Sequence, residues 1–395
     1  MVNTNQSKDY DALSLKMHEK LKGKLSVVSK YEIVDRDSLA IAYTPGVAEP
    51  CRRIHQNKDD VYKYTIKGNT VAVVTDGTAV LGLGDIGPEA SIPVMEGKAA
   101  LFKKFAGIDA FPIAVSTKDV DEFVNVVKNI APVFGGINLE DISAPRCFEI
   151  EEKLNAALDI PVFHDDQHGT AIVVLAGLIN ALKLADKKLD DVKIVFSGAG
   201  AAAIAITKLL FVYGAKNIIL SDRLGAIYEG RVENMNSIKE SISKITNMKK
   251  VKGKLKDVLA GADVFIGVSS PNVLDSDMVK SMNSKPIIFA LANPTPEIMP
   301  DVAKDAGAFI VATGRSDFPN QVNNVLVFPG IFKGALSVRA KEINNEMKIA
   351  AAIALSNCVT PAVDNILPKP FDKCAMDNVS DAVKNTAIKC KLNRI

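Results

Sequence analysis

The chain has 395 residues, a length that predicts two domains or one domain with a large extension. Its 48 Lys and Arg residues against 46 Asp and Glu residues leave a formal charge of +2, far below the basic excess of proteins that bind nucleic-acid phosphates. We therefore expect no nucleic-acid partner, and a hydrophobic content of 48% excludes a disordered chain.

The five cysteines are an odd number without a CxxC pair, so neither a disulfide framework nor a zinc module is indicated, and a reducing cytoplasm is expected. The first ten residues are polar and lack the apolar run of a signal peptide. The longest apolar stretch, 171–182, is shorter than the roughly 20 residues that cross a bilayer. We expect a buried helix there and no membrane partner.

The pattern before residue 70 is helical and irregular, and from there β-branched runs alternate with amphipathic helices. This alternation predicts an α/β protein with parallel sheets. The first series of predicted strands is 70–75, 110–115, 136–139 and 161–163, with helices near 92–105, 119–130 and 145–157. A second series, spaced as in a dinucleotide-binding sheet, covers 192–196, 217–221, 263–268, 286–292 and 308–312.

The pattern predicts three parts: an N-terminal α/β domain over 1–165, a Rossmann-like domain over 166–340 and a C-terminal helical extension over 341–395. We expect both flanks of the chain to pack on the first sheet. Lys-rich segments at 16–30 and 239–256 are either solvated helix faces, the commoner meaning of such runs, or patches for anionic ligands.

A glycine loop follows the predicted strand at 192–196 and has the form G-x-G-x-x-A. Gly198 permits the tight turn, Gly200 lets the backbone approach a pyrophosphate, and the small Ala203 lets the next helix pack on the strand. With Ala199 between the glycines, the N-terminus of that helix would face the phosphates. This context favours dinucleotide binding over a merely tight turn.

The next predicted strand ends at Asp222, 22 residues beyond Gly200. A carboxylate there accepts hydrogen bonds from the adenosine ribose and repels a 2′-phosphate, which favours NAD. Its neighbour Arg223 would offset that repulsion, so NADP stays possible.

Two acidic pairs follow neighbouring strands of the first series. Glu140 and Asp141 come after 136–139, and Asp165 and Asp166 come after 161–163, before a helix expected to begin near Gly169. Carboxylates gathered at one sheet edge need a neutralising cation, and oxygen ligands suit Mg²⁺ or Mn²⁺. The alternative for each pair alone is a solvated cap.

His164 and His168 flank the second acidic pair with i, i+4 spacing but do not form H-E-x-x-H. Zinc is therefore disfavoured, and we expect both histidines to have structural or supporting roles.

Six separated segments closely resemble the short form of the malic enzyme family, in order and spacing, over about residues 40–335. They are AYTPGVAEP at 42–50, TDGTAVLGLGDIG at 75–87, PVMEGKAALFKKFAGIDA at 93–110, INLEDISAPRCFEIE at 137–151, PVFHDDQHGTAIV at 161–173 and the glycine loop. The resemblance implies an enzyme that oxidises L-malate at C2, decarboxylates the product and protonates the enolate to give pyruvate.

The resemblance also implies roles for individual residues. The metal ligands would be Glu140, Asp141 and Asp166; Asp165 would lie beside the reacting hydroxyl, Lys98 would be the general base, Tyr43 the general acid, and Asn293, Asn324 and, less directly, Asn323 would contact substrate. Next to a metal, Lys98 is expected to lose its proton more easily than a free lysine. Without the resemblance, packing or turn roles would be favoured for Tyr43, Lys98 and the asparagines.

One position departs from the family pattern. Larger members carry a malate-binding arginine two residues before the LGLGD stretch, and Ala79 stands there in this chain. Arg52, Arg53 or a basic group from a partner subunit would have to replace it. Because members of the family form dimers, the resemblance also predicts a homodimer.

Two other functions remain open from the residues alone. A plain hydroxy-acid dehydrogenase would need no carboxylate cluster and would release no carbon dioxide. A dinucleotide-sensing module would leave Tyr43, Lys98 and the acidic residues without a task.

Overall fold

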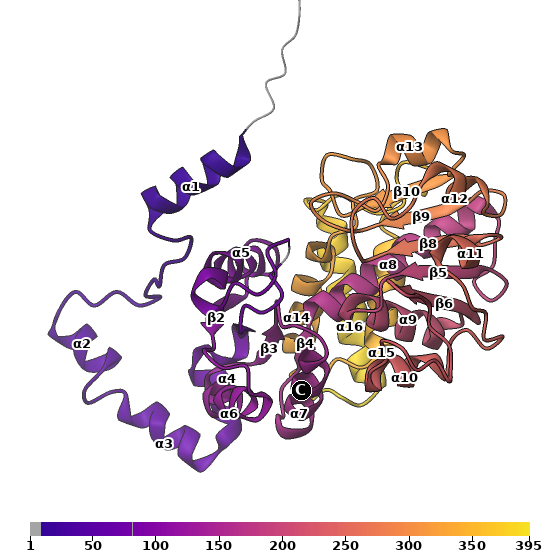
Figure 1. Cartoon of the computed structure of the whole chain (residues 1–395). Helices are drawn as coiled ribbons and strands as arrows, with labels where there is room; N and C mark the ends of the chain where they lie inside the picture. Colours follow the sequence, from indigo (N-terminus) through magenta and orange to yellow (C-terminus); the bar gives the residue numbers. More distant parts are fainter. Residues whose placement is uncertain (1–8, 81) are drawn as a thin grey trace, which may run out of the picture.

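The computed structural model describes residues 9–80 and 82–395 (Figure 1). The first eight residues, part of the stretch where the sequence predicts no signal peptide, and Leu81 of the LGLGD stretch lie outside the described residues. The chain forms two α/β domains, each with its own mainly parallel sheet, and C-terminal helices, which confirms the predicted fold class.

The first sheet has four parallel strands in the order β2-β1-β3-β4. They are β1 (Thr70–Thr75), β2 (Asp109–Ala114), β3 (Gly136–Leu139) and β4 (Val162–His164), connected through α5 (Pro88–Ala106), α6 (Val120–Ile130) and α7 (Arg146–Ala157). All four predicted strands are confirmed to within one residue at each end. Helix α5 begins earlier than predicted because Pro88 fits the first helical turn, where its missing N–H costs nothing.

The second sheet has the order β10-β9-β8-β5-β6-β7. Its strands are β5 (Lys193–Ser197), β6 (Asn217–Asp222), β7 (Gly225–Ala226), β8 (Val264–Gly267), β9 (Ile287–Ala290) and β10 (Ile310–Thr313), with α9 (Ala201–Tyr213), α10 (Ser237–Ser243), α11 (Leu255–Leu259), α12 (Ser276–Lys280) and α13 (Pro300–Asp305). Chain order reverses at β5, the topological switch point where such sheets bind nucleotides. The sequence pattern missed the antiparallel β7 because two residues are too few to show alternation.

Helix α8 (Asp165–Ala185) joins the two domains. By length and composition it is the one helix of the described residues that reaches the size of a membrane span, but 72% of its apolar window is buried inside the fold. It packs against α9 and α15 (Asn345–Ser356) and so forms the predicted buried helix. The prediction that it begins near Gly169 is wrong, because it begins directly after β4.

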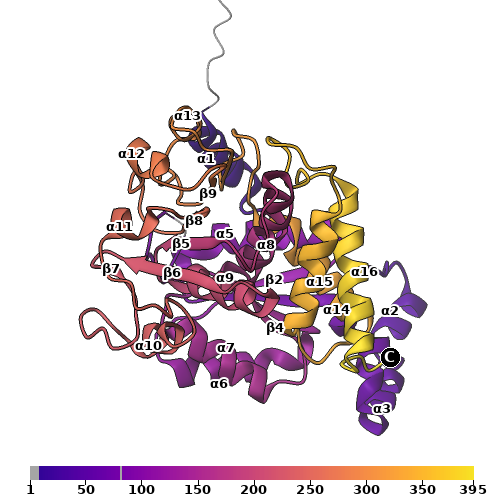
Figure 2. The same cartoon turned by 90° about the vertical axis from the view of Figure 1, so that its right-hand side faces the viewer.

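The helices that follow residue 337 pack chiefly on α8, on the helix that precedes them and on one another, and not on the first sheet as predicted (Figure 2). Helix α16 (Lys373–Lys389) lies against α14 (Phe328–Ser337), where a methyl group at Gly334 would collide with the carbonyl oxygen of Ser380. The absence of a side chain at Gly334 thus permits the close helix contact. Helix α14 in turn reaches the first domain, since the ring centroids of Phe328 and Phe102 of α5 lie 4.7 Å apart.

The N-terminal flank also differs from the prediction. Residues 10–56, called the N-terminal arm below, carry α1 (Tyr10–Leu21), α2 (Arg36–Ala42) and α3 (Ala48–Gln56) away from the first sheet (Figure 1). Helices α1 and α3 have no buried residue. The arm is tied to α5 where the Lys24 N–H donates to Glu96 Oε2 at 2.8 Å. Short elements η1 (Lys58–Asp60), α4 (Val61–Tyr64) and η2 (Ile66–Asn69) then lead into β1.

Candidate active site

The two acidic pairs leave adjacent strands at the same edge of the first sheet. Leu139 of β3 pairs with His164 of β4, so the residues that follow them emerge side by side. Because the strands are parallel, this is the carboxyl edge where α/β proteins bind ligands. Helix α8 begins at Asp165 and holds the second pair in its first turn.

Glu140, Asp141 and Asp166 form a compact group. One carboxylate oxygen from each lies within 4.8 Å of the others. The Asp141 N–H donates to Asp166 Oδ2 at 2.8 Å, and the amide of Asn138 donates to Glu140 Oε2 at 2.9 Å. Asp141 adopts a φ of 54°, a left-handed conformation that short polar side chains tolerate best.

The charges of this group favour a bound cation. Burial, followed by the neighbouring carboxylates, raises the pKa of Asp141 to about 8, and burial raises the pKa of Glu140 to about 7. Asp141 Oδ2 is buried and has no hydrogen-bond partner within the described residues. Three convergent hard oxygen donors with one unused buried oxygen fit a divalent ion such as Mg²⁺ or Mn²⁺.

Lys98 connects this group to Asp165. Its Nζ lies 2.5 Å from Asp165 Oδ2 and 2.8 Å from Glu140 Oε1, and it lies 4.3 Å from the centroid of the Phe328 ring. Burial acts to lower the pKa of Lys98, but the charges of Asp165 and Glu140 outweigh burial and raise it above the usual lysine range. With the protein's own charges alone, this is the opposite of the expected easier deprotonation; a divalent ion on the same carboxylates would counter their effect.

Asp165 has one oxygen free for a ligand. Its Oδ1 is buried without a hydrogen-bond partner among the described residues, and burial raises the pKa of this carboxyl to about 7. A methyl group at Gly169 would collide with Oδ1 and would lie 3.1 Å from Cβ of Asn324. The absence of a side chain at Gly169 therefore leaves room for Asn324 to lie close to Asp165 at the start of α8.

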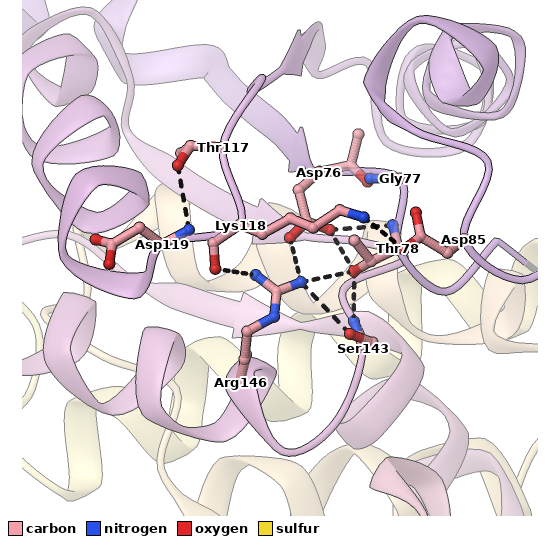
Figure 3. A network of polar contacts seen from close by, with 10 residues as sticks. Asp76, Gly77, Thr78, Asp85, Thr117, Lys118, Asp119, Ser143 and Arg146 are labelled. Carbon is pink, nitrogen blue, oxygen red and sulfur yellow. Dashed lines mark hydrogen bonds and ion pairs between the residues drawn. The ribbon is translucent and has the colours of Figure 1, made fainter.

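A polar network on Arg146 fixes the loop after β3 (Figure 3). Nη2 of Arg146 donates to Asp76 Oδ2 at 2.7 Å and to Thr78 Oγ1 at 2.9 Å, and Nη1 donates to the Lys118 carbonyl at 2.9 Å. Arg146 thereby joins segments that follow β1, β2 and β3 in the sequence.

The same network holds the backbone beside the carboxylate group. The Ser143 N–H donates to Thr78 Oγ1 at 3.0 Å, and the Ala79 N–H donates to the Asp141 carbonyl at 2.9 Å. Sequence analysis missed Arg146, and its one signal was a basic residue directly after the Ser-Ala-Pro turn.

Both histidines contact a buried glutamate, Glu151. Glu151 of α7 accepts a hydrogen bond from the His164 N–H at 3.0 Å, and its other oxygen lies 2.9 Å from His168 Nε2. Burial lowers the pKa of His164 to about 4, so its ring is neutral. Lys348 of α15 lies 3.2 Å from His168 Nδ1, which ties this cluster to the C-terminal helices.

The glycine loop has the geometry that a pyrophosphate site needs. Gly198 has a φ of 110°, and a methyl group there would lie 2.6 Å from the Val268 carbonyl oxygen. A methyl group at Gly200 would meet open space, and Ala203, in the first turn of α9, is fully buried. A cavity of about 720 Å³ opens at this loop, lined among others by Ala199, Asp222 and Arg223.

Asp222 is less free than the sequence suggests. Its Oδ1 accepts from Arg231 Nη2 at 2.8 Å and its Oδ2 accepts from Lys239 Nζ at 2.8 Å. Burial acts to raise its pKa, but the hydrogen bonds from Lys239 and Arg231 outweigh burial and hold the pKa of Asp222 below its usual value. Sequence analysis did not find these partners, because they come from the connection after β7.

The predicted substrate asparagines lie at different places. Asn293 follows β9, and its Nδ2 would lie 2.6 Å from a methyl group at Gly314. Asn324 begins η4 (Asn324–Leu326) beside Asp165. The side-chain oxygen of Asn323 instead accepts from the Val325 N–H at 3.0 Å and so caps that turn.

The structure does not bring Tyr43 to Lys98. Tyr43 ends α2 on the N-terminal arm, where its side chain is 68% exposed. Arg52 and Arg53 lie on α3 of the same arm and both pair with Glu49, at 2.8 Å and 2.9 Å.

Comparisons with known proteins agree with this architecture. Residues 22–155 match the family "Malic enzyme, N-terminal domain" and residues 167–389 match "Malic enzyme, NAD binding domain". A bifunctional malic/malolactic enzyme of Bacillus subtilis (strain 168) is 58% identical over 385 residues, covering 97% of this chain and 94% of the relative. An NADP-dependent malic enzyme of Escherichia coli (strain K12) is 49% identical, covering 95% of this chain and 52% of the relative.

The fold is shared as well. The crystal structure of an NAD-dependent malic enzyme from Thermotoga maritima superposes with a TM-score of 0.92 at 51% identity, covering 94% of this chain and 98% of that chain. Two family matches that together span most of the chain, and relatives similar over nearly its whole length, establish its ancestry. The chain therefore belongs to the malic enzyme family and is an oxidoreductase with an NAD(P)-binding domain.

Proposed function

We propose that the chain catalyses the oxidative decarboxylation of L-malate to pyruvate and carbon dioxide, with reduction of NAD or NADP. The observation that carries the proposal is the buried Lys98–Asp165 pair, which shares Glu140 with the carboxylate group at the same sheet edge. A plain hydroxy-acid dehydrogenase has no use for that group.

Glu140, Asp141 and Asp166 would hold Mg²⁺ or Mn²⁺. When bound, such an ion polarises the C2 oxygen of malate and stabilises the negative charge that develops as carbon dioxide leaves. Gly198, Ala199 and Gly200 would hold a dinucleotide, which would supply the hydride acceptor for the oxidation at C2.

Lys98 would act as the general base. Its Nζ, in the neutral form, takes the proton of the C2 hydroxyl as the hydride leaves C2, and Asp165 Oδ2 holds the resulting ammonium in place. The unused Oδ1 of Asp165 is available to orient the hydroxyl. Asn293 and Asn324 would hold the malate carboxylates through neutral amides, with Asn323 shaping the turn beside them.

Tyr43 would return a proton to C3 of the enolate. Its position on the exposed N-terminal arm supports a role at the site of a second subunit. Large apolar side chains line the arm with exposures of 74% at Leu15, 90% at Val27 and 78% at Val28. Such a surface is typical of an interaction face. We propose a homodimer in which the arm of one subunit covers the partner and brings Tyr43, and with it the basic α3, to the partner's site.

The remaining partners are small molecules. We propose L-malate as the substrate; the formal charge of +2 argues against a nucleic-acid partner, and the burial of α8 argues against a membrane partner. Five free cysteines support a reducing cytoplasm as the compartment.

A second candidate activity is the conversion of malate to lactate and carbon dioxide. It is favoured by the Bacillus subtilis relative, which is called a bifunctional malic/malolactic enzyme. In that reaction the reduced dinucleotide would return its hydride to C2 of pyruvate before product leaves, so no net cofactor is consumed.

The test mixes purified protein with L-malate, Mn²⁺ and either NAD or NADP, and follows reduced cofactor, pyruvate, lactate and carbon dioxide. We expect pyruvate, carbon dioxide and reduced cofactor in equal amounts, and loss of turnover when a chelator is added. Cofactor reduction without carbon dioxide, or turnover that a chelator leaves unchanged, would contradict the proposed function. Lactate without net cofactor reduction would support the second candidate.

A further inference from the structure

Two cysteines meet at the junction of the last two helices. Cys358 comes directly after the end of α15, and Cys374 lies in the first turn of α16, which packs beside α15 (Figure 2). The Cys374 thiol donates to Cys358 Sγ at 2.8 Å, and the amide of Asn378 donates to both sulfur atoms, at 3.1 Å and 3.5 Å. Both cysteines are free, and a disulfide bond would require the two sulfur atoms to approach by only about 0.8 Å.

Contacts to two other helices hold the segment between the cysteines. Asn180 of α8 is buried, and its amide donates to the carbonyls of Ser356 and Ile366, at 2.8 Å and 3.0 Å. Near the other end of the segment, the ring centroids of Phe371 and Phe105 of α5 lie 5.6 Å apart. The packing of the folded chain on α8 and α5 therefore keeps the two thiols together.

The two thiols lie in unlike surroundings. Cys374 is exposed, and the free N–H groups and dipole of the first turn of α16 stabilise a negative charge there. Cys358 is half-buried, and its thiol donates to the Ala354 carbonyl at 3.5 Å. Burial, followed by the hydrogen bond with Cys374, raises the pKa of Cys358 to about 12. A peroxide therefore reacts with Cys374 first, because peroxides oxidise accessible thiolates.

We propose that Cys374 and Cys358 form a disulfide in response to peroxide, with Cys374 as the thiol that is oxidised first and Cys358 as the thiol that resolves it. The Cys374 thiolate attacks one oxygen of hydrogen peroxide, the O–O bond breaks, and hydroxide leaves, so that Cys374 becomes a sulfenic acid. The Cys358 sulfur then attacks the sulfenic sulfur. The S–S bond forms, the S–O bond breaks, and the hydroxyl group leaves as water with the Cys358 proton. Two thiols are oxidised, and one peroxide is reduced to water.

The disulfide would protect Cys374, because a sulfenic acid that no thiol captures is oxidised further to a sulfinic acid, which is not readily reversed. It would also close the segment that contacts α8 and α5. Thiol–disulfide exchange with small thiols would return the pair to its reduced form. The inference does not depend on the proposed malate chemistry.

The test treats the reduced full chain with a small molar excess of hydrogen peroxide, blocks the remaining thiols with iodoacetamide in denaturant, and identifies tryptic peptides by mass spectrometry. We expect two of the five cysteines to escape alkylation. Peptides 349–373 and 374–384 should appear joined, with the loss of two hydrogen atoms, and dithiothreitol should separate them.

Single variants test the order of the two steps. In Cys358→Ser the sulfenic acid on Cys374 should persist and be trapped by dimedone, whereas in Cys374→Ser Cys358 should stay reduced. Cys390→Ser is the matched control, because it removes a thiol at the opposite end of α16 and should form the joined peptides as the wild type does. The Tm of each reduced variant should match that of the wild type.

A wild-type chain in which peroxide leaves both thiols open to alkylation would overturn the inference, as would conversion of Cys374 to a sulfinic acid without joined peptides. Oxidation of Cys358 in Cys374→Ser as fast as in the wild type would contradict the assigned order. None of these readouts uses malate, metal or dinucleotide. A chain that forms the disulfide but does not oxidise malate would contradict the proposed function and leave this inference standing.

Discussion

Lys98 is balanced by two carboxylates in a place where water does not reach, since its side chain is 8% exposed and that of Asp165 is fully buried. The sequence identified Lys98, Asp165 and the three carboxylates through a family resemblance and through their places at strand ends. It did not identify the pairing of Lys98 with Glu140, which lies 42 positions away in the sequence. It also did not identify the ion pairs of Asp222, whose partners lie 9 and 17 positions away. Both contacts form only when the folded chain brings these residues together.

Replacing Lys98 tests its role as base. In Lys98→Ala we expect kcat for malate oxidation to fall by roughly 10²–10⁴-fold, the usual contribution of a positioned acid or base. Lys104→Ala, an exposed lysine on the same helix, is the control and should keep wild-type activity. Initial rates of cofactor reduction measure both, and full activity in Lys98→Ala would exclude this base.

Asp141 tests the metal site without a change of shape. Asn tolerates the φ of 54° that Asp141 adopts, so Asp141→Asn should fold with a Tm in chelator at or above that of the wild type. Mn²⁺ at about 100 times its Kd should stabilise the wild type by about 2.7 kcal/mol and the variant hardly at all. Thermal denaturation with and without Mn²⁺ measures this difference, and equal stabilisation of both proteins would place the ion elsewhere.

At the scale of elements, the strands followed from their apolar runs and the site followed from the ends of β3 and β4. The start of α8 and the strand β7 did not follow. Helix α8 begins at Asp165 because its acidic first turn suits a helix N-terminus, although Gly169 suggested a later start. Strand β7 depends on pairing with β6, and a pattern of two residues carries no such information.

The loop after β3 owes its shape to Arg146. In Arg146→Gln the buried carboxylate of Asp76 loses its cation, and we expect a loss of about 2–3 kcal/mol in the free energy of unfolding, with weaker Mn²⁺ binding because the Asp141 backbone is less fixed. Urea denaturation and Mn²⁺ titration measure the two effects. The exposed Lys118–Asp85 pair is the control: Lys118→Ala should change stability by less than about 1 kcal/mol. Equal effects of the two substitutions would show that Arg146 has no special role.

At the scale of the whole molecule, the two domains and the C-terminal helices form a continuous core, and the N-terminal arm stands outside it. The sequence could not show this, because the apolar residues of the arm look the same whether they face their own chain or another copy. In the proposed homodimer Tyr43 would complete the partner's site, whereas within a single chain it lies on the exposed N-terminal arm.

Mixed dimers separate these two arrangements. Lys98→Ala and Tyr43→Phe subunits are each expected to be nearly inactive, but a mixture that exchanges subunits should regain activity, because one site of each mixed dimer then combines the intact Lys98 of one subunit with the intact Tyr43 of the other. Light scattering should show a dimer throughout. A dimer whose mixtures stay inactive would mean that Tyr43 acts within its own chain.

We propose that Glu140, Asp141 and Asp166 share one divalent ion beside Lys98 and Asp165. A crystal structure of the chain with Mn²⁺, with anomalous data collected at the manganese edge, tests it most directly. We predict one strong anomalous peak at roughly 2.1 Å from an oxygen of each of the three carboxylates. A peak elsewhere, or three carboxylates that point to separate places with no peak between them, would contradict it.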